Sequence, residues 1–442
     1  MENFAFRKNT LNTRGNGVDR FIHPREYLTD LQQHWRPHIR MRNKNILDTK
    51  FWNQKDYVNR LDKAFGVEEE SDKYVVKPWP CIPRRKSYLT SADSVLDLPT
   101  FSKAESPELL DWSSNNILVA ALGKNYFKWS WGSQKLSGRG WTNYKIRSCK
   151  FDPRGELLLL GTDSNSIWVH DNERSKLVSY SRCVCRYDNF CSITSLDWSP
   201  TGNAFVTGCT RGKVASFTRS SQPISFIRKV RANQRQPIFS VRISPDARFA
   251  AITTLHSTEV LLVTWPHLRP IHIFEFEDSF TTAITWHPWR SALLGRGALT
   301  KGVQTRVAMC CTPTGDIKEA TLDGEYTLDA MLFSHKTGEL TMSLYNIESG
   351  LIHPETSSHL VVLSDLNTVV DQWRDDGRTG LNRVRTMVFS PDGTKLATAT
   401  SNEDLIIWNF LPERKQKSKS KMHKFSAIPV YLDVLTPGCA LR

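Results

Sequence analysis

The sequence predicts an all-β protein, a seven-bladed β-propeller with flexible N- and C-terminal tails. Two observations lead to this prediction: a short motif recurs seven times, and β-strand patterns surround each copy. The motif is an apolar residue, any residue, an aromatic or apolar residue, and then a polar turn. Its third position recurs at intervals of 39 to 56 residues, at Trp112, Phe151, Trp198, Ile243, Trp286, Phe333 and Phe389. A period of roughly 45 residues that joins strands through polar turns is typical of propeller blades.

The elements within each repeat follow the order of a WD repeat. In the turn Ser-Pro-Asp-Gly (390–393), Pro fixes one φ angle and Gly permits a positive one, as a hairpin requires. Apolar stretches such as ELLLLGT and KLATATS follow the turns and predict second strands. Third strands are predicted where an apolar stretch ends in or near an aromatic residue, in YFKW (126–129), SIWV (166–169), VASF (214–217) and LIIW (405–408).

The ring must close, because an isolated blade cannot bury both of its faces. The segment SVLDLP (94–99), just before the first repeat, is expected to pair with the seventh blade. The propeller is therefore predicted to span residues 91–410. Its fifth and sixth blades are the least regular, and the glycine-rich stretch GRGALTKG (295–302) is expected to be a loop.

The net charge of +14 is concentrated at the two ends of the chain. Residues 1–90 carry 18 Lys and Arg against 11 Asp and Glu, a net +7, and residues 411–442 carry 7 against 2, a net +5. We therefore expect a basic, largely disordered N-terminal tail (1–90) and a basic C-terminal tail (411–442). A nucleic-acid-binding ring would carry its basic residues on the globular face, so nucleic acid is not an expected partner.

Other classes of protein lack support in the sequence. No stretch is apolar enough to span a membrane, and the first residues contain no apolar signal-peptide core, so we expect no membrane partner and a location in the cytoplasm and nucleus. Phosphate-binding, zinc-hydrolase and nucleophile motifs are missing. The sequence therefore predicts no enzyme, no catalytic residue, no metal site and no cofactor.

The nine cysteines are scattered, without a Cys-x-x-Cys pair or histidines at zinc-ligand spacing. Only Cys183, Cys185 and Cys191 form a suggestive cluster. We interpret them as reduced thiols in a loop and a strand of an intracellular protein, because small buried thiols commonly serve as apolar side chains.

The tail contains one segment that is unlike its surroundings, GVDRFIHPREY (17–27). Phe21, Ile22 and Tyr27 stand among charged residues and Pro24, a pattern that suits neither a strand nor a helix face. Short segments of this kind are usually linear motifs that become ordered in a partner's groove.

Taken together, these features resemble the Fizzy family, the WD-repeat activators of the anaphase-promoting complex, a ubiquitin ligase. The most specific stretches are LLDWSSNNILVAALG (109–123), WHPWRSALL (286–294) and FSPDGTKLATATSNEDLIIWNF (389–410). DRFIHPR resembles the family's C-box, with His23 at the place of its proline, and the last two residues resemble its Ile-Arg tail. The degree of divergence is similar to that of a fast-evolving meiotic insect branch.

The resemblance implies two docking segments for subunits of the anaphase-promoting complex, to which the chain would bind as a monomer. Apolar residues would fill pockets and arginines would pair with carboxylates. The ligase-docking residues are expected to be Asp19, Arg20, Phe21, Ile22, Pro24 and Arg25 in the C-box, and Leu441 and Arg442 at the end of the chain.

The resemblance also implies that the ring binds degrons, in substrates such as cyclins. In the family, acidic residues between the first and last blades hold the arginine of a destruction box, and Asp111 and Glu403 match those positions. Arg383 matches a contact for KEN-box degrons. However, LHSTE (255–259) and GRGAL (295–299) replace two family loops, which predicts weak or lost KEN binding.

Two alternatives remain at this stage. A WD-repeat scaffold that has lost degron recognition fits the altered loops, whereas retention of Asp111 and Glu403 favours a degron-binding coactivator. A nucleic-acid-binding propeller depends on the basic tails alone.

Overall fold

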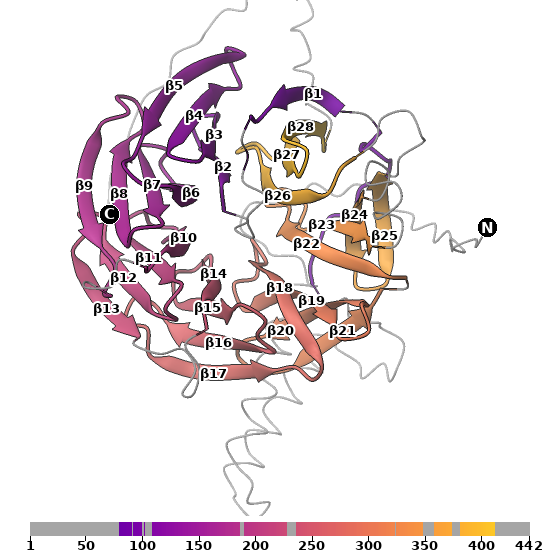
Figure 1. The fold of residues 1–442 in the computed structure, drawn as a ribbon. Coiled ribbons are helices and arrows are strands. Elements are labelled where there is room, and N and C mark those ends of the chain that lie inside the picture. The colour runs from indigo at the N-terminus through magenta and orange to yellow at the C-terminus, as the bar shows by residue number, and fades with distance from the viewer. Residues whose placement is uncertain are drawn as a thin grey trace, which may run out of the picture.

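The computed structural model describes residues 79–90, 92–99, 101, 108–185, 190–227, 236–322, 324–347, 358–373 and 381–411. Within them, strands β1 to β28 form seven antiparallel sheets of four strands each. The sheets are arranged side by side in a ring (Figure 1). The prediction of a seven-bladed propeller is confirmed. No helix in these ranges is long and apolar enough to cross a membrane.

Each blade is a meander whose first strand lies nearest the centre of the ring (Figure 1). Blades one to three are β2 (Leu110–Trp112), β3 (Ile117–Leu122), β4 (Asn125–Ser130) and β5 (Lys135–Trp141); β6 (Ile146–Phe151), β7 (Leu157–Thr162), β8 (Ser166–Asp171) and β9 (Leu177–Arg182); and β10 (Ile193–Trp198), β11 (Ala204–Cys209), β12 (Val214–Thr218) and β13 (Pro223–Ile227).

The later blades repeat this order. Blades four to six are β14 (Ile238–Ile243), β15 (Phe249–Thr254), β16 (Glu259–Thr264) and β17 (Pro270–Glu275); β18 (Ser279–Trp286), β19 (Leu293–Thr300), β20 (Thr305–Cys311) and β21 (Ile317–Thr321); and β22 (Tyr326–Phe333), β23 (Leu340–Asn346), β24 (Ser358–Asp365) and β25 (Thr368–Trp373).

Blade seven combines the two ends of the ring. Its first three strands are β26 (Val384–Phe389), β27 (Lys395–Thr400) and β28 (Asp404–Asn409), and its fourth is β1 (Ala92–Asp97). β1 pairs antiparallel with β28 along most of its length. The predicted closing strand is therefore confirmed.

The burial of each strand explains its composition. The second strand of blade two, LLLLGT, is buried at every position, whereas the fourth strand, LVSYSR, is largely exposed. A strand that is covered on both faces has a continuous run of apolar residues, whereas an outer strand needs fewer of them. The aromatic residues predicted to mark third strands lie there, at Trp129, Trp168, Phe217 and Trp408.

The turns of the blades define two faces of the ring. We call the face with the turns between first and second strands the first-turn face, and the face with the turns between second and third strands the second-turn face. On the first-turn face, Gly155 has φ of 72°, and a Cβ there would lie 2.7 Å from the Ser114 Oγ of blade one. The glycine therefore serves both the turn and the close approach of two blades.

The expectation of a loop at 295–302 is wrong for most of that stretch, because residues up to Thr300 belong to β19. A Cβ on Gly297 would lie 2.7 Å from Leu328 of blade six, and one on Gly295 would lie 3.2 Å from Phe333. These glycines permit close packing between blades and do not form a turn.

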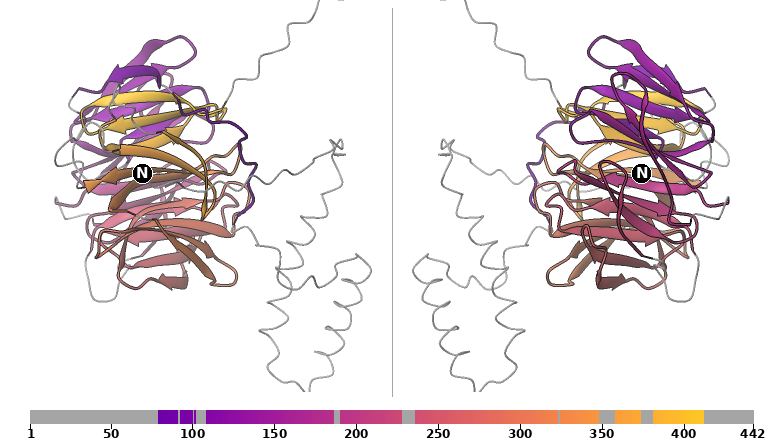
Figure 2. Two further views of the ribbon diagram at one scale, coloured as in Figure 1. Left: turned by 90° about the vertical axis from the view of Figure 1, so that its right-hand side faces the viewer. Right: turned by 90° about the vertical axis from the view of Figure 1, so that its left-hand side faces the viewer.

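Residues 79–90 lie along one face of the ring ahead of β1, as the indigo segment in Figure 2 shows. Trp79 is fully buried and packs edge-to-face on Phe333, with ring centroids 5.7 Å apart. The Ile82 amide donates to the Thr337 carbonyl at 2.7 Å. The packed region thus extends to Trp79, beyond the predicted boundary at residue 91. We call residues 79–90 the strap.

Arg84 joins the strap to blades six and seven. Its guanidinium contacts Glu339 at 2.8 Å and Asp371 at 2.7 Å, and the three side chains are at most 1% exposed. It also lies 4.1 Å from the centre of the Phe410 ring and donates to the Phe410 carbonyl. One buried cation therefore satisfies two buried carboxylates from blade six.

Replacing Arg84 should destabilise the ring strongly. Arg84→Met leaves two buried carboxylates without a cation, and we expect the free energy of unfolding to fall by roughly 3–5 kcal/mol. Thermal unfolding of the full chain measures the effect. Arg85→Met is the matched control, because Arg85 is exposed. Equal midpoints for the two variants would contradict this role for Arg84.

The neutral imidazole of His287 binds the start of the strap through a hydrogen bond. Its Nε2–H donates to the Pro80 carbonyl at 2.8 Å, while Nδ1 accepts from the Trp289 and Arg290 amides at 3.2 and 3.1 Å. Burial, partly offset by the bond to Pro80, lowers the pKa of His287 from 6.5 to about 4. A second proton on Nδ1 would break its two hydrogen bonds.

The lowered pKa of His287 predicts a loss of stability in acid. Between pH 6.5 and about 4 the unfolded chain binds a proton at His287 that the folded chain does not. The contribution of neutral His287 to the free energy of unfolding is therefore complete above pH 6.5 and is lost as the pH is lowered toward 4. The total loss is about 3 kcal/mol. Unfolding measured from pH 7 to 4.5 should show a shallower loss for His287→Gln, whose amide can still donate to Pro80. Equal slopes would contradict the assignment.

Candidate functional site

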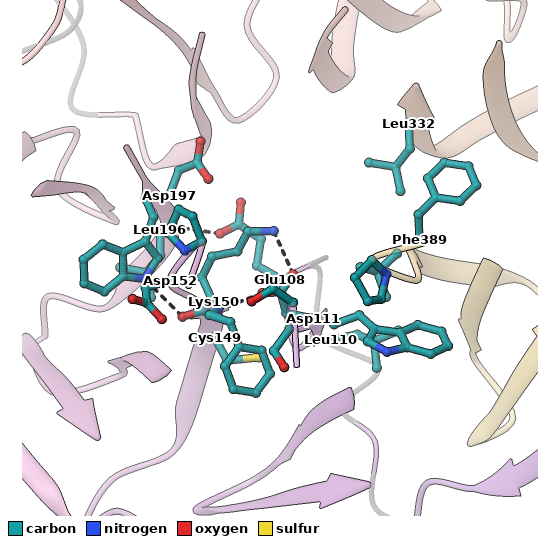
Figure 3. A pocket seen from close by; sticks show the side chains of 18 of the residues that line it. Glu108, Leu110, Asp111, Cys149, Lys150, Asp152, Leu196, Asp197, Leu332 and Phe389 are labelled. Atoms are coloured by element: carbon teal, nitrogen blue, oxygen red, sulfur yellow. Dashed lines mark hydrogen bonds and ion pairs between the residues drawn. The ribbon is translucent and has the colours of Figure 1, made fainter. Parts of the chain in front are cut away.

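The central pocket opens at the first-turn ends of the inner strands. It has a volume of about 510 Å³ and is lined by residues of blades one, two, three, four, six and seven. Figure 3 shows Glu108, Asp111 and Lys150 on one side of this pocket and Leu332 and Phe389 on the other. The pocket thus has a charged half and an apolar half.

The difference between the two halves is set by one position of the repeat. It is the second position of the motif, directly before the aromatic or apolar third residue. This position alternates in charge through the first four blades and is uncharged in the last three. Its occupants in order are Asp111, Lys150, Asp197, Arg242, Thr285, Leu332 and Val388.

The charged residues bind one another and the neighbouring backbone. Asp111 pairs with Lys150 at 2.8 Å and accepts the Phe151 amide at 2.7 Å. Asp197 accepts the Ile243 amide of blade four at 2.8 Å. Each carboxylate therefore couples its own blade to the next one, and the Asp111 side chain is only 6% exposed.

Glu108 extends this network across the channel. It precedes β2 in blade one, yet its carboxylate accepts the Ser195 hydroxyl and the Leu196 amide of blade three, both at 2.8 Å. It also pairs with Arg242 of blade four at 2.8 Å. A single side chain thus links three blades around the centre.

The pKa shifts agree with this pairing. Burial alone would lower the pKa of Lys150, but Asp111 and Asp197 outweigh it and the pKa is raised. The pKa of Arg242 is raised because Glu108 and Asp197 likewise outweigh burial. Burial raises the pKa of Asp197, partly against the effect of Arg242 and Lys150. The charged half thus holds three carboxylates and two cations that stabilise one another.

A second cluster of charge lies at the closing seam on the second-turn face. Asp97 of β1 stands directly opposite Asp404 of β28, and the Leu98 amide donates to the Glu403 carbonyl at 2.6 Å. Asp97 is exposed and the other two acids are half-buried. Among the described residues no cation pairs with any of these three carboxylates. We call Asp97, Glu403 and Asp404 the acidic seam.

Glu403 occupies a position that favours other residue types. It has φ of 73° at the turn before β28, where the same turn has Asn165 in blade two and Gly212 in blade three. Asn and Gly adopt this left-handed conformation readily, whereas Glu does so at a cost of roughly 1–2 kcal/mol. His256 in blade four and Val303 in blade five have the same conformation, so the turn itself sets it. Glu403 is a candidate for binding because its carboxylate has no cation partner among the described residues.

Asp111 and Glu403 do not face one cleft. Asp111 lies near the Phe389 end of β26, whereas the turn containing Glu403 lies near its start, where the Ser401 amide donates to the Arg383 carbonyl. The 6 residues of β26 span roughly 17 Å. One arginine shared by both acids does not fit this arrangement, and the degron-binding roles of the two residues stay predictions.

Arg383 lies at the same end of the ring as Glu403. Its guanidinium makes two contacts of 2.5 Å with Asp329 of blade six and lies 4.8 Å from the centre of the Tyr345 ring. Its side chain is 30% exposed. A ligand at this site would meet an arginine that already has a carboxylate partner.

The docking residues fall outside the described part of the chain. This applies to Asp19, Arg20, Phe21, Ile22, Pro24, Arg25, Leu441 and Arg442. Their assignment stays a prediction. Within the described residues, one group is arranged to hold a metal ion, the buried cysteines 183, 185, 191 and 209.

Comparisons with known proteins agree with the fold. Residues 149–288 match the model of the anaphase-promoting complex subunit 4 WD40 domain, and residues 377–409 match that of the WD domain, G-beta repeat. A solved structure titled "Crystal Structure of Mitotic Checkpoint Complex" has a TM-score of 0.61 and 19% identity, over 78% of this chain and 97% of that chain. At this identity the likeness shows the fold alone.

Similar curated proteins cover the whole chain. Protein cortex of Heliconius erato is 50% identical over 100% of both chains, and protein cortex of Biston betularia is 44% identical over 96% of both. Cell division cycle 20.5, cofactor of APC complex, of Arabidopsis thaliana is 24% identical over 82% of this chain and 77% of its own. The chain therefore belongs to the Fizzy family of WD-repeat proteins, the non-catalytic coactivators of the anaphase-promoting complex.

Proposed function

We propose that this protein recruits substrates to the anaphase-promoting complex for ubiquitination. The ring binds destruction-box degrons of cyclin-type proteins, and the two tails dock on the ligase, in the cytoplasm and nucleus of meiotic cells. The observation that carries the degron-binding part is the acidic seam, a set of carboxylates at the ring closure without a cation among the described residues.

The acidic seam suits an arginine. Like charges directly opposite each other on neighbouring strands repel, and an incoming guanidinium relieves this repulsion with bidentate hydrogen bonds. Of the two acids first assigned to the degron, half-buried Glu403 has a carboxylate without a partner in the described part of the chain, whereas Asp111 binds Lys150 and the Phe151 amide. We therefore assign arginine binding to Glu403 and Asp97, and coupling between blades to Asp111.

An apolar contact lies beside the seam. Val95 is 55% exposed and lies on the same face of β1 as Asp97, two residues away. An extended peptide could thus place an arginine on the acids and an apolar residue on Val95. This spacing suits a degron that combines a basic and an apolar anchor.

A WD-repeat scaffold that has lost degron recognition is a second candidate, and one observation favours it. The Arg383 guanidinium already donates two hydrogen bonds to the Asp329 carboxylate, so a KEN peptide would have to compete with Asp329. We therefore propose that destruction-box binding at the seam outweighs KEN binding at Arg383.

Docking should depend on the arginines of the C-box-like segment. Arg20→Ala or Arg25→Ala removes a charge-assisted pair, which should weaken binding to the purified ligase roughly tenfold or more. Deleting Leu441 and Arg442 should have a milder effect, since a bivalent ligand keeps its other contact. Arg14→Ala, outside the segment, is the control. Normal ligase binding by the Arg20 variant would contradict the assignment.

Degron binding should depend on the acidic seam. Glu403→Lys and Asp97→Lys should each lower the affinity of the full chain for an arginine-containing destruction-box peptide by roughly tenfold, because attraction becomes repulsion. Fluorescence anisotropy with a labelled peptide measures this, and a peptide with the arginine replaced by alanine should lose the difference. Glu173→Lys, at an exposed turn of blade two, is the matched control. If all three variants bind equally, the peptide does not use the seam.

A further inference from the structure

Four cysteine side chains meet inside the junction of blades two and three. Cys183, Cys185 and Cys191 belong to the connection between β9 and β10, and Cys209 ends β11. All four are at most 6% exposed. The sequence alone suggested only the first three, as reduced thiols, and offered no fourth ligand.

The strand register supplies the fourth cysteine. In the β10–β11 hairpin, Cys209 stands opposite Ile193, two residues after Cys191. Ser192 and Thr210 exchange hydrogen bonds beside them, with the Thr210 amide donating to the Ser192 carbonyl at 2.9 Å and the Ser192 amide to the Thr210 Oγ at 3.0 Å. The hairpin therefore fixes the spacing of Cys191 and Cys209 whether or not a ligand is bound.

The backbone also fixes the other end of the connection. The Cys183 amide donates to the Asn165 carbonyl at 2.8 Å, and the Asn165 amide donates to the Cys191 carbonyl at 2.6 Å. The turn of blade two thus holds Cys183 and Cys191 from one side, while β11 of blade three supplies Cys209. Both supports are rigid elements of the ring, which is the arrangement expected of a preformed site.

The sulfur positions match a tetrahedral metal site. All four Sγ atoms lie within 4.8 Å of one another, and those of Cys185 and Cys209 are 3.8 Å apart. A tetrahedral Zn²⁺ site with Zn–S distances of about 2.3 Å has sulfurs about 3.8 Å apart. A disulfide needs sulfurs about 2.0 Å apart, and the four cysteines are free.

We propose that Cys183, Cys185, Cys191 and Cys209 bind one structural zinc ion that joins blade two to blade three. Binding exchanges the water ligands of Zn²⁺ for four thiolates and releases the thiol protons to solvent. The complete set of protein ligands and its burial leave no open position for a substrate, so the site is structural. The ammonium of Lys213 acts electrostatically on Cys185 and offsets part of the negative charge of the tetrathiolate.

The alternative is that the thiols are only apolar filling, and a matched comparison separates the two. Cys149 and Cys310 are also buried and free but lie outside the cluster. Replacing either by Ser makes the same change of a buried thiol to a hydroxyl, in other parts of the core, without removing a zinc ligand. Loss of metal confined to the four clustered cysteines therefore distinguishes coordination from general destabilisation.

Metal analysis of the purified full chain is the direct test. Zinc by elemental mass spectrometry should be about one ion per chain in the wild type and in Cys149→Ser and Cys310→Ser, and should fall at least severalfold in Cys191→Ser and Cys209→Ser. Zinc at background in the folded wild-type chain would overturn the proposal, as would equal zinc in the Cys191 and Cys209 variants or iron in its place.

Measurements on the wild-type chain keep the test valid if those variants fail to fold. Exchange with Co²⁺ should give the strong visible absorption of a tetrahedral tetrathiolate site. Chelation should lower the melting temperature and expose four further thiols to alkylation. Two results would overturn the proposal. One is a disulfide between Cys185 and Cys209 in protein that is alkylated without any reductant, and the other is an unchanged number of alkylated thiols after chelation.

Discussion

The ring depends on the pairing of β1 with β28. This strand ladder joins the two ends of the propeller within blade seven. Neighbouring blades instead meet through side-chain packing, ion pairs and single backbone hydrogen bonds, such as the one from the Cys149 amide to the Glu108 carbonyl. The strap reinforces the closure, since Arg84 ties the segment before β1 to the buried acids of blade six. The closure also explains the acidic seam: β1 can place Asp97 opposite Asp404 only because it completes blade seven.

Charge serves a different purpose at the centre of the ring. There the carboxylates of Glu108, Asp111 and Asp197 accept backbone amides or cations from other blades. A buried carboxylate is tolerated only when it is paired and hydrogen-bonded, so these residues act as bonds between repeats. Carboxylates without a cation partner among the described residues lie where solvent reaches them, at the seam. The structure thus separates acids that hold the ring together from acids that are free to meet a ligand.

The repeat pattern predicted most of the fold, because the spacing of apolar and turn residues is set by the geometry of a blade. It failed where one residue type has two physical uses. The glycines of GRGAL favour turns and close packing equally, and here Gly297 lies against Leu328 within β19. The charged half of the pocket was also missed, although Asp111, Lys150, Asp197 and Arg242 occupy the same place in successive repeats. Glu108 lies outside the repeat and gave no signal.

The two site predictions that changed share a physical origin, which is strand direction. A residue just before the first turn of a blade lies near the first-turn face of the ring, and a residue in the second turn lies on the second-turn face. Asp111 and Glu403 therefore lie near opposite faces of the ring although their blades are neighbours. The same geometry brings together residues that are distant in sequence: the hairpin register sets Cys209 beside Ile193 and so close to Cys191. Once the first turn of a blade is located, register assigns both a face and a partner to each position. The seam and the cysteine cluster therefore follow from the register of the strands more than from the residue types of any single motif.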